Sequence, residues 1–376
     1  MDFALTEEQG MLQDSVSRFI DNDYDFEKRQ KIAESEAGYS AELWGTFAEL
    51  GWTSVPFAEE DGGFGGGPIE LMLMMEQFGR GLVVEPFLAN VVLAGGVLRR
   101  VADAEQKTQW LSPIIDGSRQ AAFAFAEPQS RHVLADVKTT ALKSDDGYRL
   151  NGKKALVING GRADFIIVVA RSSGDQKDES GLSLFVVDAA AQGVSRHSYP
   201  MVDGHQAAEI TLQDVLVPAT ACLGEAGNAF ATIQSVIDEA TLAVCAEASG
   251  IMQAMLSRTL EYAKNRVQFG VPIGSFQALQ HRMVDMLMAC EQTRSLLLWA
   301  AMVNSEGGAD AARSISALKY LIGTSGRKVG QEAVQIHGGM GVSWEVDVAH
   351  YFKRLTAIEI LFGNADFHLT RYIESS

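Results

Sequence analysis

The chain has 376 residues, enough for two or three domains and a large core. Hydrophobic residues make up 47% of it and charged residues 21%, proportions typical of a folded globular protein. The formal net charge of −17 argues against a nucleic acid or an anionic membrane as partner, because both attract basic surfaces.

The cysteines and the two ends of the chain exclude several further classes. Cys222, Cys245 and Cys290 are too widely spaced for a CxxC pair, so neither a disulfide framework nor a metal site is predicted. The N-terminus MDFALTEEQ lacks the features of a signal peptide, and no apolar run approaches the roughly 20 residues of a membrane span. We therefore expect a cytoplasmic protein, in a bacterial or organellar interior.

Residues 1–117 are expected to form an N-terminal α-helical domain. Thr6, followed by two glutamates, is typical of a helix start, and a second helix is predicted over 41–50. The glycine-rich stretch 59–67 lacks the Lys-Ser/Thr of a P-loop and follows no predicted strand. It is therefore interpreted as a mobile loop between helices rather than as a phosphate cradle.

Residues 118–223 are expected to form a middle β domain. Short β-prone segments separated by glycine and aspartate turns, with no helix between them, predict a small antiparallel barrel or sandwich. The six predicted strands are 121–125, 148–150, 155–158, 165–170, 182–187 and 209–212. The polar tract 172–180 is predicted to be a hairpin loop.

Residues 224–376 are expected to form a C-terminal four-helix bundle. A helical apolar period runs over 233–256, 276–303 and 311–336, separated by glycine-rich turns. The predicted fold is thus α+β and multi-domain, with helices, a β-barrel and helices in that order.

Several motifs stand in one order along the chain and together resemble the acyl-CoA dehydrogenase family. Residues 266–277, RVQFGVPIGSFQ, are similar to the family signature RxxFGxxIxxFQ, and 333–341, AVQIHGGMG, to AVQIxGGxG. Glu127-Pro128 stands where the family has TEPxxGSD, and Asn151 to Lys154 matches NGxK. The loop 50–65 and the passage 214–227 also resemble family segments. The resemblance therefore covers essentially the whole chain.

The resemblance implies a flavoprotein that uses FAD to oxidise the Cα–Cβ bond of an acyl-CoA. In the family a glutamate removes the α proton and flavin N5 takes the β hydrogen as hydride. Electron-transfer flavoprotein is the usual acceptor. Members are mostly homotetramers, in which the ADP half of FAD reaches across a subunit interface.

The part that would hold the ADP half of FAD matches the family well. By resemblance, Arg266 pairs with the pyrophosphate, two glutamines offer amides, and glycines let the backbone approach the cofactor. The predicted cofactor-binding residues are Arg266, Phe269, Gln277, Gln335, Gly338, Gly339 and Gly341. The alternative for the three glycines is a simple helix C-cap and turn.

The part that would face the isoalloxazine ring departs from the family. Ala126 replaces a threonine, Leu156 replaces an aromatic side chain, and Ile158 replaces a hydroxyl residue, so these side chains cannot hydrogen-bond. Gln129 to His132 stands in place of Gly-x-Gly-Ser. Arg131 and His132 are candidates for binding the CoA phosphates or substrate, with an ordinary surface loop as the alternative.

The usual catalytic glutamate is replaced by Phe362, which cannot accept a proton. The position that some members use instead is Ala240. Glu247 lies seven residues later on the same predicted face and is the candidate catalytic base; a glutamate paired with a neighbouring helix is the alternative. Glu239 and Asp366 are weaker candidates, and Glu239 is expected to face solvent or a partner. His337 is expected to support or cap the glycine turn.

Three functions remain open at this point. The first is a complete acyl-CoA dehydrogenase with a relocated base. The second is one subunit, similar to the small subunits of pimeloyl-CoA or steroid-type heteromeric dehydrogenases, that completes a partner's FAD site in a heterotetramer. The third is a flavin oxidase or monooxygenase of the same fold.

Overall fold

The computed structural model describes residues 4–308 and 310–375, so the first three residues of the N-terminal segment MDFALTEEQ lie outside the described residues. The chain divides into two compact units. The helical unit contains residues 1–31, 67–83 and 241–376, and the sheet unit contains residues 32–66 and 84–240.

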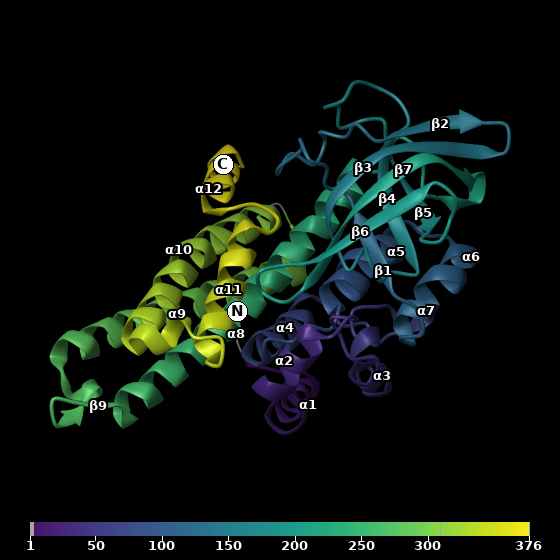
Figure 1. Ribbon diagram of the computed structural model, residues 1–376. Coiled ribbons are helices and arrows are strands. Elements are labelled where there is room, and N and C mark those ends of the chain that lie inside the picture. The colour runs from purple at the N-terminus through teal and green to yellow at the C-terminus, as the bar shows by residue number, and fades with distance from the viewer. Residues whose placement is uncertain (1–3, 309, 376) are drawn as a thin grey trace. The chain divides into compact units, whose positions relative to one another are not determined.

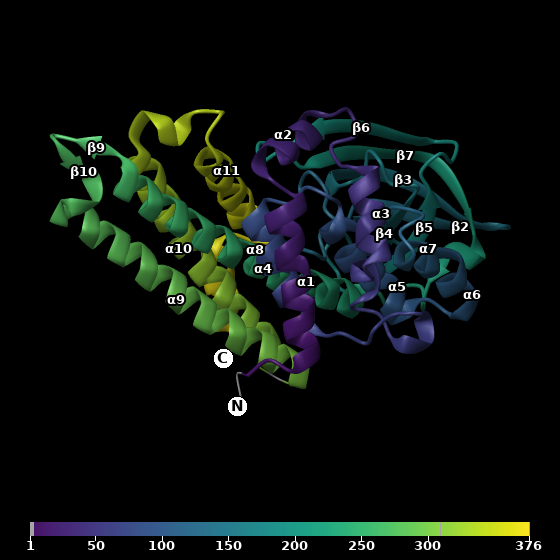
Figure 2. The ribbon, with the colours of Figure 1, turned by 90° about the horizontal axis from the view of Figure 1, so that it is seen from below.

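The helical unit is built mainly from long helices, drawn in green to yellow in Figure 1. The helix α8 enters this unit from the sheet unit, and α9 and α10 run side by side in both views (Figures 1 and 2). Its helices are α1 (Glu7–Asp23), α2 (Phe26–Glu34, shared with the sheet unit), α4 (Pro68–Gly81), α8 (Phe230–Asn265), α9 (Gln277–Glu306), α10 (Ala311–His337), α11 (Asp347–Ile360) and α12 (Ala365–Glu374).

The predicted start of the first helix is confirmed. The Thr6 side chain accepts a hydrogen bond from the Gln9 amide, and the Gln9 side chain accepts one from the Thr6 amide. This reciprocal capping satisfies two amides that helix geometry leaves without partners. Val16 and Phe19 are buried on one face of α1.

Two glycines bring α4 and α8 into close contact within the helical unit. A Cβ on Gly79 would lie 2.0 Å from the carbonyl oxygen of Glu247, and one on Gly250 would lie 1.9 Å from that of Glu76. No larger residue fits at these two crossings, since both contacts are to backbone. The close approach also places the side chains of Glu76 and Glu247 in the interior.

The sheet unit combines one eight-stranded sheet with short helices. Its helical elements include α3 (Ala41–Glu49), α5 (Gly96–Val101), α6 (Ala104–Gln106), α7 (Ser112–Ile115) and the π-helical turns η3 (Leu88–Gly95) and η4 (Lys107–Leu111). Its strands are β1 (Ala121–Ala124), β2 (Thr140–Ser144), β3 (Gly147–Ile158), β4 (Phe165–Arg171), β5 (Leu182–Asp188), β6 (Val194–Pro200), β7 (Gln206–Pro218) and β8 (Cys222–Leu223).

The predicted antiparallel barrel is not confirmed. The strand order is β6-β7-β3-β2-β4-β5-β8, with β1 paired to β4, and the sheet is not closed. The β1–β4 pair and the single β2–β4 pairing are parallel, so the sheet is mixed. The fold is therefore α+β, with an open sheet where the sequence suggested a barrel.

The strands themselves differ from the prediction in two ways. The segments 148–150 and 155–158 belong to one long strand, β3, which two register irregularities interrupt. The strands β2 and β6 were not predicted, because their largely exposed residues lack an apolar alternation. The hairpin loop over 172–180 is confirmed, since antiparallel β4 and β5 flank it.

The glycine-rich stretch 59–67 does connect helical elements, and its first part folds back on the preceding turn. The Gly63, Gly65 and Gly66 amides donate to the carbonyls of Ala58, Phe57 and Val55. The short 3-10 helix η2 (Glu59–Asp61) lies within it. These backbone hydrogen bonds give the loop a defined path within the sheet unit.

One helix in the described part of the chain, α8, is long and apolar enough to cross a membrane by length and composition. However, 89% of its most apolar window is buried inside the structure. That burial is typical of a core helix of a folded domain. Cys245 and Cys290 are also buried in the helical unit.

Candidate functional site

The residues predicted to hold the ADP half of FAD lie at the ends of helices in the helical unit. Arg266 follows the last residue of α8, and a two-stranded hairpin of β9 (Val267–Gln268) and β10 (Val271–Pro272) begins there. Figure 2 shows this hairpin at the end of α8, where the chain turns toward α9. Phe269, at its tip, has a φ of 56° and a side chain that is 93% exposed.

A stacked pair of rings joins the base of the hairpin to the glycine segment. Tyr262 and His337 have ring centroids 4.3 Å apart and an interplanar angle of 25°. The His337 Nδ1 lies 2.8 Å from the Ala333 carbonyl oxygen, which can only accept, so this nitrogen carries the proton. These contacts hold the His337 ring at the end of α10, directly before the glycine segment, whereas Tyr262 was missed because no motif contains it.

The glycine segment itself is open. A Cβ on Gly338 or Gly339 would meet no atom within 4 Å, although Gly338 has a φ of 62°, whereas one on Gly341 would lie 2.5 Å from the Val334 carbonyl oxygen. Gly341 is thus required by packing inside the unit. Gly338 and Gly339 leave free space above an exposed backbone, as a cofactor contact would need.

The remaining predicted ADP-side residues are exposed in the same unit. Gln277 is the first residue of α9, and Gln335 lies two residues before the end of α10. The exposed guanidinium of Arg266 makes no side-chain hydrogen bond or ion pair with any residue described. An exposed arginine fits a pyrophosphate, which takes bidentate guanidinium contacts. The structure thus has residues suited to the ADP half of FAD.

A buried ion pair joins two motifs in the sheet unit. Lys154, on β3, places its Nζ 2.7 Å from Glu127 Oε1, and the two side chains are 0% and 2% exposed. Glu127 also accepts from the Lys138 and Thr139 amides and from the Gln129 side chain. The sequence placed both residues in family motifs but gave no sign that they pair.

Burial opposes both charges of this pair. Burial alone would raise the Glu127 pKa, but the Lys154 charge and the hydrogen bonds outweigh it and hold that pKa at about 2. Burial lowers the Lys154 pKa to about 8 despite the neighbouring carboxylate. The carboxylate is consequently a fixed anchor, because it stays ionised throughout the physiological range.

Arg131 and His132 lie in the turn that this anchor holds. Arg131 is exposed with a φ of 47°, and His132 is half-buried. Arg171, largely buried, donates to several backbone carbonyls on both sides, including those of Ala135 and Ser180. The turn therefore has a defined backbone, and an exposed cation stands on it.

Three positions that would face the flavin ring depart from the family, and they lie around a register irregularity of β3. They are Ala126, Leu156 and Ile158. The Ala155 amide donates to the Ala126 carbonyl, which ties the TEP-like segment to the strand. Leu156 has a φ of 51° and a 42% exposed side chain, and Ile158 is half-buried. At these three positions only the main chain can hydrogen-bond, because none of the side chains carries a donor or an acceptor.

Phe362, at the usual position of the base, lies in a strained turn between α11 and α12. Its φ is 59°, a region that bulky residues rarely adopt. The buried Lys319 on α10 donates to the carbonyls of Glu359 at 3.0 Å and Gly363 at 2.6 Å. The His368 Nε2 lies 3.0 Å from the Phe362 carbonyl oxygen. The Asn364 side chain also caps α12 by accepting from the Phe367 amide. Four hydrogen bonds thus fix this turn.

Glu247, the candidate base, forms a bidentate ion pair with Arg354 of α11. The Nε–Oε1 and Nη2–Oε2 distances are 2.6 and 2.7 Å. The arginine side chain is 2% exposed and the glutamate side chain 4%. This is the alternative that the sequence left open, a glutamate paired with a neighbouring helix. Both carboxylate oxygens are engaged, which is poor geometry for proton abstraction.

The weaker carboxylate candidates are placed differently. Glu239 does not face solvent: its two oxygens pair with Arg99 and Arg100 of α5 at 2.5 and 2.7 Å. Asp366 is exposed in the first turn of α12. The sequence missed Glu76, a buried carboxylate that accepts from the Ser249 hydroxyl at 3.0 Å and whose pKa is raised by burial.

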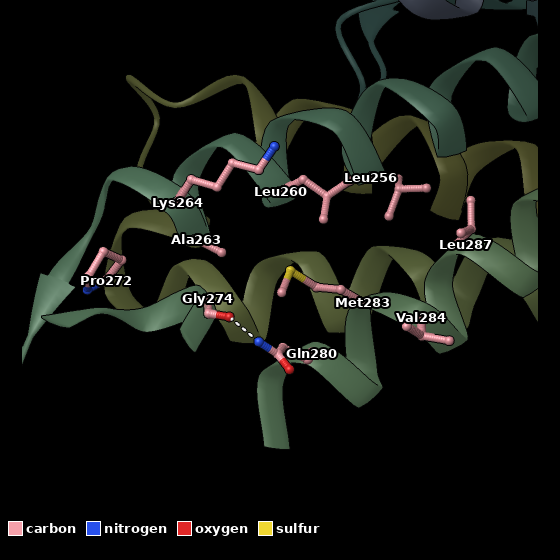
Figure 3. A pocket seen from close by; sticks show the side chains of 10 residues that line it. All are labelled: Leu256, Leu260, Ala263, Lys264, Pro272, Gly274, Gln280, Met283, Val284 and Leu287. Carbon is pink, nitrogen blue, oxygen red and sulfur yellow. Dashed lines mark hydrogen bonds between the residues drawn. The ribbon is translucent and has the colours of Figure 1, made fainter. Parts of the chain in front are cut away.

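An apolar groove of about 460 Å³ lies between α8 and α9 beside the hairpin (Figure 3). Gln280 and Lys264 supply the polar side chains at its rim, and Gln280 Nε2 donates to the Gly274 carbonyl at 2.9 Å. The groove is lined by Leu256, Leu260, Ala263, Lys264, Pro272, Gly274, Gln280, Met283, Val284 and Leu287.

Comparisons with known proteins decide the family. Three family models match, described as the N-terminal, middle and C-terminal domains of acyl-CoA dehydrogenase, over residues 6–118, 122–215 and 227–375. "Probable acyl-CoA dehydrogenase YngJ" of Bacillus subtilis (strain 168) is 31% identical over 97% of each chain. The chain belongs to the acyl-CoA dehydrogenase family.

Two solved structures of similar proteins extend this family assignment. "PigA with FAD and proline" matches with a TM-score of 0.93 and 28% identity, over 100% of this chain and 98% of that one. The "ChsE4-ChsE5 complex from Mycobacterium tuberculosis" matches with a TM-score of 0.90 and 27% identity, over 100% and 98%. The predictions of an oxidoreductase of the acyl-CoA dehydrogenase family, with FAD as the family's cofactor, are confirmed.

Proposed function

We propose that this acyl-CoA dehydrogenase works as one subunit of a heteromeric enzyme. In this proposal it holds the ADP half of FAD through Arg266 and the Gly338–Gly339 backbone. A second dehydrogenase chain supplies the catalytic base. FAD provides the hydride acceptor when it is bound, an acyl-CoA is the substrate, and electron-transfer flavoprotein is the acceptor.

The observation that carries the proposal is the state of the two candidate base positions. Phe362 has no proton-accepting group, and the carboxylate of Glu247 is engaged at both oxygens by Arg354. Removing the α proton of a thioester needs a free carboxylate close to substrate. With neither position able to supply one, dehydrogenation by this chain alone is disfavoured.

The groove between α8 and α9 supports assembly with a second acyl-CoA dehydrogenase chain. Leu260, Val284 and Leu287 line the groove and are 36%, 52% and 46% exposed, and Phe269 adds an almost fully exposed ring on the adjoining hairpin. Exposed apolar side chains that gather in a groove are typical of an interface. We propose a heterotetramer, with a homotetramer as the alternative.

Arg131 and His132 remain proposed contacts for substrate. Arg131 is an exposed cation on a turn with a defined backbone, which suits a CoA phosphate. The three-domain division at 1–117, 118–223 and 224–376, the four-helix organisation of the last part and a cytoplasmic location are also retained as proposals. The family models, which end at 118 and resume at 122 and 227, support the division.

Purification of the chain alone tests the proposal most directly. We expect little or no FAD by absorbance at flavin wavelengths, and stoichiometric FAD after coexpression with a full-length dehydrogenase subunit from the same organism. Purified complex should bleach anaerobically with acyl-CoA. If the chain alone holds FAD and is reduced by acyl-CoA at a catalytic rate, the heteromeric proposal is wrong.

A Glu247 variant tests whether this residue is the catalytic base. Glu247→Gln in the complex should leave the rate of flavin bleaching within about threefold once folded protein is compared, because Glu247 is not the base in this proposal. The same substitution in the partner's catalytic carboxylate should abolish bleaching. Loss of bleaching in folded Glu247→Gln complex would restore Glu247 as the base.

A further inference from the structure

The buried amine of Lys319 has no role in the proposed function. Lys319 is fully buried on α10, and its Nζ donates to two main-chain carbonyls that flank residue 362, those of Glu359 and Gly363. The carbonyl of Glu359 belongs to the last turn of α11, where a cation complements the helix dipole. The amine thus ties the end of one helix to the start of the following turn.

The turn that Lys319 holds is unusual in its backbone. Phe362 has a φ of 59° and Gly363 a φ of 114°. A Cβ on Gly363 would lie 2.4 Å from Phe367 and 2.8 Å from His368, so α12 packs directly against the turn. A bulky residue in the left-handed region persists only where its surroundings hold it there. The two carbonyl contacts of Lys319 and the His368 contact supply that restraint.

We propose that Lys319 is a positioning residue that fixes the main chain at Phe362, so that the side chain at this position is presented in one direction. The inference rests on the proposed function for the claim that residue 362 faces the acyl-CoA. The geometry of the tether stands apart from that claim. Lys319 acts through residue 362, because its Nζ donates to the main-chain carbonyls on either side of that residue.

The amine suits this task in either protonation state. Two carbonyl oxygens accept from it, and a neutral amine also carries two N–H donors. A methionine of similar shape would leave both carbonyls without their buried donor, which destabilises the turn locally. A glutamine would restore one amide donor and should therefore restore part of the tether.

A thiol placed at position 362 reports on the tether. The background is Cys222→Ser, because Cys245 and Cys290 are 0% and 2% exposed and react slowly. In Phe362→Cys protein, the rate of labelling by dithionitrobenzoate is compared with and without Lys319→Met. We expect Lys319→Met to raise the rate at least tenfold and Lys319→Gln to raise it by less.

Two controls separate local positioning from general loosening. Lys328→Met removes a half-exposed lysine of the same helix, which pairs with Asp285, and should change the rate less than twofold. A second probe, Ser295→Cys at an exposed position of α9, should label at the same rate in all backgrounds. The proposal is overturned if Lys319→Met leaves the labelling rate of the Phe362→Cys probe within twofold, or if it speeds both probes equally. Should Lys319→Met not fold, Lys319→Gln is compared with Lys328→Gln by the same criterion.

Labelling of the thiol at position 362 in the presence of acyl-CoA tests the proposed function separately. Butyryl-CoA and octanoyl-CoA are added to the FAD-loaded complex carrying Phe362→Cys. Slower labelling with acyl-CoA, but not with desulfo-CoA, which lacks the thiol that would consume the reagent, supports a substrate-facing position for residue 362. If labelling responds to Lys319→Met but not to either acyl-CoA, the tether stands and the placement of substrate at this turn fails.

Discussion

Glu127 and Lys154, 27 residues apart on the chain, form an ion pair of 2.7 Å from which solvent is almost completely excluded. The pair joins the segment after β1 to the strand β3. Its neighbourhood contains the turn with Arg131 and His132 and the irregular part of β3 with Leu156. It therefore holds together the region of the sheet unit in which the substrate and flavin-ring candidates lie.

Breaking this pair should be costly. Lys154→Met leaves Glu127 buried and charged, and we expect the free energy of unfolding to fall by about 3–5 kcal/mol. The double variant Glu127→Gln, Lys154→Met removes both charges and should recover part of that loss. Urea unfolding followed by circular dichroism measures both. A cost below about 1 kcal/mol for the single variant would show that the pair is not a structural anchor.

The same pair predicts a stability change in acid. The Glu127 pKa is held at about 2 in the folded protein, below its ordinary value of 4.5. The folded state therefore binds the proton less readily, and the carboxylate's contribution is present above pH 4.5 and lost as the pH falls toward 2. The difference in unfolding free energy between wild type and Glu127→Gln should shrink over this interval. A difference that is independent of pH would contradict the low pKa.

Lys319 predicts a second stability change, in alkali, which also rises with pH. Burial lowers its pKa from 10.5 to about 8, so the folded state releases this proton at a lower pH than the unfolded chain does. Its contribution to stability should rise as the pH increases from about 8 to about 10.5, because the cost of burying the charge disappears. The difference in unfolding free energy between wild type and Lys319→Met, measured by guanidinium unfolding at each pH, isolates this change. An exposed-site control, Lys328→Met, should show no such slope.

Glu247 should behave as a structural carboxylate. Glu247→Gln leaves the Arg354 guanidinium buried without its counter-charge, and we expect a loss of about 3–5 kcal/mol in unfolding free energy. The matched control is Glu359→Gln, which breaks the more exposed pair with Arg327 and should cost less than about 1 kcal/mol. Equal costs for the two variants would argue that Glu247 is not held by its ion pair.

Arg266 should affect cofactor binding and leave folding unchanged. Because its side chain forms no hydrogen bond or ion pair with the residues described, Arg266→Met should alter the unfolding free energy by less than about 0.5 kcal/mol. Loss of a charge-assisted contact to the pyrophosphate should weaken FAD binding by roughly ten- to a hundredfold. Titration of FAD into the apo complex measures this, with Lys328→Met, an exposed lysine outside the groove, as control. Unchanged FAD affinity would remove Arg266 from the cofactor site.

The sequence alone determined much of this protein. Motif order identified the family, helix starts such as Thr6 were read from local capping, and the hairpin loop after β4 followed from its polar composition. These features depend on residues close together in the chain, where short-range hydrogen bonds and apolar spacing fix the outcome. The replacement of a base by Phe362 was also visible without coordinates.

Only the tertiary structure decided which side chains pair. Glu247 looked equally suited to be a base or an ion-pair partner until Arg354, 107 residues away, met both of its oxygens. Tyr262 stacks on His337, and Lys319 reaches the turn at Phe362, through contacts that no local pattern encodes. The open sheet also escaped prediction, because strand order depends on which distant edges meet. A sequence determines the residue types, whereas the environment that sets their charge and partners arises only when the chain folds.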